Sequence, residues 1–141
     1  MKTVVGLTIL IPFTLCLDQG PLLAQACQDE EEMVKTSVKD LTDLIEIVKK
    51  ENVTDFQSHY HQKSYLSKTT FLASVVGGLL DCLDKAAQDS AATKEQVDGY
   101  KAKRQTYAKL KSKVEEKRNA VKSANDPQNA KTLIEKSDLS P

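Results

Sequence analysis

The stretch from Phe71 to Leu83, FLASVVGGLLDCL, constrains the fold of this 141-residue chain more than any other. It is the one strongly apolar run beyond the start of the chain, and only Ser74, two glycines and Asp81 interrupt it. A helix that is apolar on all sides must be covered on more than one side. Thirteen residues are too few to span a bilayer. The run therefore predicts a buried core helix.

The first 26 residues have the pattern of a secretory signal peptide. Lys2 is the positive charge, Val4 to Leu17 is the apolar segment, and Ala24-Gln25-Ala26 supplies small residues for cleavage. We expect cleavage after Ala26 and a secreted, extracellular protein. Cleavage after Cys16, a retained membrane anchor and a bacterial lipid anchor on Cys27 are weaker alternatives.

The remaining chain, residues 27–141, is long enough for one domain with one core. Its positive and negative charges balance, which argues against nucleic acid as a partner. The absence of Trp and the 5% aromatic content disfavour a strand-rich core. Helix-forming residues predominate instead, so the composition indicates an all-α fold without a transmembrane segment after residue 26.

Residues 29–50 form the first predicted helix because apolar residues recur at alternating spacings of four and three. These are Val34, Val38, Leu41, Ile45 and Val48, and Met33, Leu44 and Ile47 widen the stripe. A second helix is expected over residues 55–88, with a half-buried first half that includes Tyr60 and Leu66.

A third helix is predicted to start at Thr93, where Gln96 completes a capping box. Asp126 followed by Pro127 is the start signal for a short fourth helix that reaches about Glu135. The expected fold is an antiparallel up-down-up bundle of three long helices over residues 27–124. Residues 125–141 would add the short helix and a C-terminal tail.

Cys27 and Cys82 are predicted to form one disulfide, because an exported chain with two remaining cysteines favours a bond. If the first two helices turn near Val53, Cys27 lies level with about residue 79, within one helical turn of Cys82. Closing a loop of about 55 residues would stabilise the fold by about 4 kcal/mol.

Asn52-Val53-Thr54 is an N-glycosylation sequon in the predicted turn, so Asn52 is a candidate glycan site. The small residues Ala73, Ser74, Gly77 and Gly78 form a second candidate site. They either let another helix approach closely or leave a crevice for a small apolar ligand.

Residues 94–122 carry ten basic and four acidic residues, whereas residues 27–58 carry four basic and nine acidic ones. The simplest interpretation is that the first and third helices are neighbours with complementary charge. An alternative is a basic ridge that binds an anionic surface. Its residues would be Lys101, Lys103, Arg104, Lys109, Lys111 and Lys113.

Catalytic chemistry has little support in the sequence. Asp55 and His59 lack a third metal ligand, and no nucleophile and base stand in a recognisable arrangement. Asp81 is a candidate buried acid, for which pairing with a basic residue of another helix is the favoured interpretation. We expect a non-enzymatic module without cofactor or metal that binds another extracellular protein. A carrier of an apolar ligand such as a lipid, or a binder of anionic surfaces, is the alternative.

Overall fold

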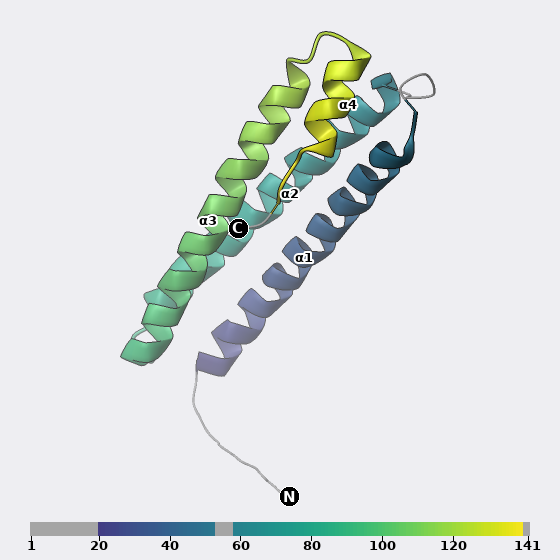
Figure 1. Ribbon diagram of the computed structural model, residues 1–141. Helices are drawn as coiled ribbons and strands as arrows, with labels where there is room; N and C mark the ends of the chain where they lie inside the picture. The colour runs from purple at the N-terminus through teal and green to yellow at the C-terminus, as the bar shows by residue number, and fades with distance from the viewer. Residues whose placement is uncertain (1–19, 53–57, 140–141) are drawn as a thin grey trace, which may run out of the picture.

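The computed structural model describes residues 20–52 and 58–139, and these form four helices and no strand. Helix α1 spans Gly20–Lys50, α2 Ser58–Ala87, α3 Lys94–Lys122 and α4 Pro127–Glu135 (Figure 1). Each long helix runs antiparallel to the one before it in the sequence, and α4 is short. The structure therefore confirms the predicted all-α bundle.

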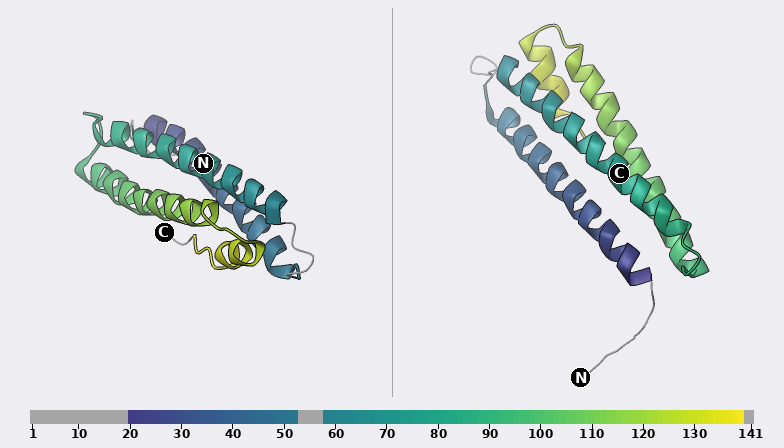
Figure 2. Two further views of the ribbon diagram at one scale, coloured as in Figure 1. Left: turned by 90° about the horizontal axis from the view of Figure 1, so that it is seen from above. Right: turned by 180° about the vertical axis from the view of Figure 1, so that it is seen from behind.

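Helix α2 is the centre of the bundle, because it packs against both α1 and α3 along their lengths (Figure 2). The short α4 contacts all three long helices near the end where α1 leads into α2. With 9 residues against 29 to 31 in the long helices, α4 fills only about a third of the fourth position of a four-helix bundle.

The apolar run of α2 is buried on its inner side, where Leu72, Val76, Leu79 and Leu83 belong to the core. The run is covered on more than one side, by α1 and α3, as expected, whereas the expectation that Asp81 is buried is wrong. Phe71 is 56% exposed, and Ser74 and Asp81 also face solvent. Because α2 meets its neighbours on two sides only, its remaining side stays uncovered. Asp81 is therefore a surface acid.

The whole of α2 is longer than its apolar run. Among the described residues, the segment from His59 to Ala87 is long and apolar enough to cross a membrane by length and composition alone. In the bundle its inner side packs into the core, and Cys82 bonds it to α1. A central core helix has the same composition as a membrane span.

The ends of α3 and α4 follow the sequence signals. Thr93 accepts a hydrogen bond from the Gln96 amide at 3.1 Å, and the Gln96 side chain accepts one from the Thr93 amide at 2.9 Å. The Asp126 carboxylate accepts from the Asn129 amide at 2.8 Å, with Pro127 in the first helical turn. Both predicted caps are confirmed, because each supplies a partner for amides that the helix leaves unpaired.

Buried polar contacts hold α4 and the tail against the turn end of the hairpin. Lys131, only 6% exposed, donates to the Val48 carbonyl at 2.9 Å and pairs with Glu135. The Tyr65 hydroxyl lies 2.6 Å from the Ser137 hydroxyl oxygen. These contacts satisfy polar groups that would otherwise be costly to bury.

Candidate interaction surface

Cys27 and Cys82 form a disulfide between α1 and α2, with their Cα atoms 5.7 Å apart. The bond links the two helices at the end of the hairpin that is remote from its turn, as predicted from the distances of the two cysteines from that turn. A disulfide is compatible with an extracellular protein, because such bonds persist in oxidising compartments.

The predicted small-residue crevice is divided between two sides of α2. Ala73, Ser74 and Gly77 line an open groove with the α3 residues Lys111, Glu115 and Arg118, together with Thr70 of α2. Gly78 faces α1 instead, since a Cβ atom built there would lie 2.9 Å from Glu30 Oε2. The α3 wall of the groove carries a 2.9 Å ion pair between Lys111 and Glu115. The groove is open to solvent and its α3 wall carries charged residues, unlike the enclosed sites typical of lipid carriers.

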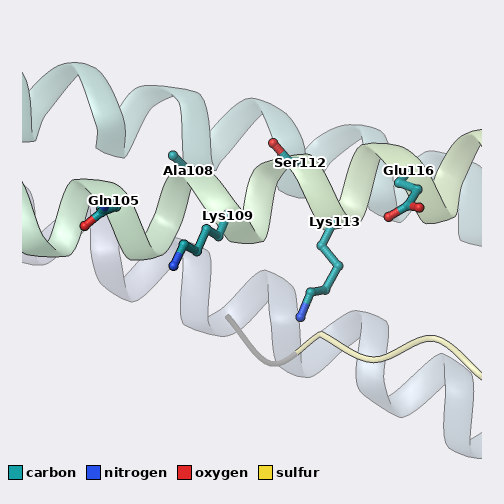
Figure 3. A pocket seen from close by; sticks show the side chains of 6 residues that line it. All are labelled: Gln105, Ala108, Lys109, Ser112, Lys113 and Glu116. Carbon is teal, nitrogen blue, oxygen red and sulfur yellow. The ribbon is translucent and has the colours of Figure 1, made fainter.

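The six residues of the predicted basic ridge are distributed around α3. Three of them pair with acids: Lys103 with Glu31 at 3.1 Å, Arg104 with Asp84 at 2.6 Å, and Lys111 with Glu115 at 2.9 Å. Lys109 and Lys113 extend from the same side of α3 beside a shallow groove (Figure 3). Lys101 is exposed in the second turn of α3. At least half of the ridge cations are thereby paired within the chain.

Glu31 provides the predicted contact between the acidic first helix and the basic third helix. Its carboxylate accepts a 2.6 Å hydrogen bond from the Tyr107 hydroxyl and a 3.1 Å bond from Lys103. Burial alone would raise the pKa of Glu31, but these hydrogen bonds outweigh it and hold that pKa below its ordinary value. The backbones of α1 and α3 do not pack closely, however; each packs against α2, so the predicted neighbourhood is limited to long side chains such as these.

The largest exposed apolar side chains among the described residues belong to α1 and α2. Met33 is 47% exposed, Ile47 52%, Tyr60 66% and Phe71 56%. Met33 and Ile47 are two heptads apart on α1, and Tyr60 and Phe71 are three turns apart on α2, so each pair shares one side of its helix.

We define the outer face as Met33, Asp40, Ile47, Tyr60, Ser67, Lys68 and Phe71. Its middle is a groove between α1 and α2 lined by Thr36, Ser37, Asp40, Ser67, Lys68 and Phe71. On α1, Asp40 is nine residues from Glu31, which places it about 180° from the residue that contacts α3. The outer face thus looks away from α3.

Sequence reasoning did not identify this face. Met33 and Ile47 were assigned to the edge of the apolar stripe of the first helix, and Tyr60 was expected to be half-buried. The available signal was the width of that stripe, since Met33, Asp40 and Ile47 recur every seven residues beside the core positions.

Several predicted features lie wholly or partly outside the described residues. The signal peptide is described only from Gly20, where the α1 backbone begins. Asn52 is exposed directly after α1, but Val53 and Thr54 of its sequon are not described. The pair Asp55 and His59 likewise includes one residue outside the described ranges. Within those ranges, no three metal-ligating side chains cluster.

Comparison of this chain with protein-family models, with curated proteins and with solved structures finds no match to any of them. Its function must therefore be inferred from its own surface.

Proposed function

We propose that this protein is a small secreted interaction module that binds another extracellular protein through the outer face of its α1–α2 hairpin. The observation that carries the proposal is the exposure of four large apolar side chains on that one face. Phe71 lines the groove, and Met33, Ile47 and Tyr60 extend the apolar surface beyond it along the two helices. Exposed apolar groups that share one face are typical of binding sites, whereas scattered single ones are ordinary.

The chemistry of the outer face suits a protein partner. Phe71 and Tyr60 are aromatic anchors, and aromatic residues are enriched where protein interfaces gain most of their binding free energy. Asp40 and Lys68 lie between them and form a 2.8 Å ion pair that could also bind polar groups of a partner. The disulfide fixes the spacing of the two helices, which lowers the ordering cost of binding.

The other functions considered from the sequence have less support. A lipid carrier needs an enclosed apolar cavity, but the groove beside Gly77 is open and has charged residues on its α3 wall. A binder of anionic surfaces needs unpaired cations, but Lys103, Arg104 and Lys111 are already paired. We propose no catalytic role.

Secretion and glycosylation complete the proposal. The signal-like residues 1–26 and the disulfide both favour export, and Asn52 is exposed next to the hairpin turn. In a eukaryotic host, Asn52→Gln should lower the mass of the secreted protein by that of one glycan. An unchanged mass would refute glycosylation without bearing on the outer face.

Photo-crosslinking tests the binding role. A photo-reactive amino acid in place of Phe71 should link the secreted protein to one defined partner when its native medium is irradiated. The same amino acid in place of Lys94, exposed on α3, is the control and should give no such product. If position 71 also gives no product, the proposed function is wrong.

A further inference from the structure

We infer that the protein bound at the outer face is a second copy of this chain. This inference rests on the proposed function, because it names the partner of the same surface. The two copies would pack face to face around a two-fold axis that runs parallel to the bundle.

The register of the hairpin supports this arrangement. The Cys27–Cys82 bond, the Asp40–Lys68 ion pair and the approach of Glu30 to Gly78 all join residues whose numbers add up to about 108. A residue of α1 and a residue of α2 whose numbers add up to about 108 therefore lie at the same height along the bundle. Ile47 is therefore nearly level with Tyr60, and Phe71 lies about four residues from the level of Met33.

A two-fold axis along the bundle places α1 of one copy opposite α2 of the other without changing the height of any residue. Such an interface is self-complementary, as symmetric dimer contacts must be. Ile47 would face Tyr60 of the second copy, and Met33 would lie about 6 Å along the axis from Phe71, within reach of the two side chains.

Charge complementarity is the strongest argument. At the middle of the face, Asp40 of each copy would lie opposite Lys68 of the other. The side chain of Asp40 is 63% exposed even in its ion pair with Lys68 of the same chain, so it can accept a second cation. The two copies would then form a four-residue network of alternating charge between two apolar patches.

The size of the face predicts a weak dimer. From Met33 to Ile47 it is about 21 Å long, and two helices are about 20 Å wide, so each copy would bury about 400 Å². A total near 800 Å² is below the roughly 1,200 Å² at which stable specific interfaces begin and fits a weak, transient contact. We expect a dissociation constant in the micromolar range, and therefore a mass that rises with concentration.

Charge exchange between chains tests the proposal. Analytical ultracentrifugation of the disulfide-bonded protein should show a monomer–dimer equilibrium. Asp40→Lys and Lys68→Asp should each raise the dissociation constant at least tenfold, since like charges would then face each other. Mixing the two variants should restore dimers, because each chain then offers the charge that the other needs.

Restoration on mixing distinguishes contact between chains from contact within one chain, since the ion pair within each variant stays broken. Lys94→Asp, on the exposed surface of α3, is the matched control and should leave the mass unchanged. Circular dichroism should show that both variants are folded.

The proposal is wrong if the native protein stays monomeric at several hundred micromolar, or if mixing the variants restores nothing. A monomeric protein whose position 71 still crosslinks to a different protein would overturn this inference and leave the proposed function intact. A monomer without any crosslink would overturn both.

Discussion

Glu31 and Tyr107 show how single residues connect the charge pattern to the fold. Burial is the main cause that raises the pKa of the Tyr107 hydroxyl, and the hydrogen bond to Glu31 raises it further. The hydroxyl therefore stays protonated and able to donate. Glu31 is the acceptor, and its pKa lies below the ordinary value of 4.5. A carboxyl whose pKa falls on folding stabilises the fold most where it is ionised.

This pair makes the stability of the bundle depend on pH. The contribution of Glu31 should be complete above about pH 4.5 and should be lost as the pH falls through its lower folded-state pKa. Tyr107→Phe should therefore lower the free energy of unfolding by about 1 kcal/mol at pH 7 and by less at pH 3. Urea denaturation at the two pH values measures both.

Tyr100→Phe is the control for that measurement, since Tyr100 is a half-buried tyrosine of the same helix without a hydrogen bond described for its hydroxyl. It should change stability little at either pH. An equal loss for Tyr107→Phe at pH 7 and pH 3 would show that Glu31 is not the relevant acceptor.

At the scale of elements, α2 is weakened by its own glycines. Each glycine in a helix interior costs about 1 kcal/mol relative to Ala. A Cβ at Gly77 would lie 3.8 Å from Lys111 Cε, an ordinary contact, whereas one at Gly78 would lie 2.9 Å from Glu30 Oε2. Although neighbours in sequence, they therefore differ in how much room a methyl group would have.

We expect Gly77→Ala to raise the free energy of unfolding by about 0.5 to 1 kcal/mol, because helix propensity improves without a clash. Gly78→Ala should gain less, since the end of the Glu30 side chain must move aside. Urea denaturation of the two variants side by side gives the comparison. A destabilised Gly77→Ala variant would mean that α2 and α3 pack more tightly there than the structure shows.

The elements themselves follow from local sequence. The capping box at Thr93 and the Asp126-Pro127 start signal act within a few residues, so both helix starts could be predicted. The disulfide was predictable because two antiparallel helices fix which residues lie level. The exposure of Phe71 and Asp81 could not be predicted, because the side of α2 that faces solvent depends on where the neighbouring helices pack. The outer face was missed for the same reason.

At the scale of the whole molecule, the α1–α2 hairpin is held together at both ends. The Cys27–Cys82 disulfide closes the open end, and α4 covers the turn end through Lys131. Lys131→Met would remove this donor, but the Val48 carbonyl would still accept from the Glu51 amide at 3.2 Å, so we expect a loss of about 1 kcal/mol. We expect faster amide hydrogen exchange in α4 and the last turn of α1, and unchanged exchange near Cys82. Uniform acceleration would contradict a local role.

Removing the disulfide should affect the opposite end. Replacing both cysteines, Cys27→Ser with Cys82→Ser, releases a loop that spans 55 residues, which should lower the free energy of unfolding by about 4 kcal/mol. Amide exchange should increase most in the first turns of α1 and the last turns of α2, where the helix ends lose their link, and less around Lys131. The reduced native protein, with its thiols blocked, should behave in the same way. If exchange instead accelerates equally at both ends, the bundle unfolds as one unit and the two fastenings are not independent.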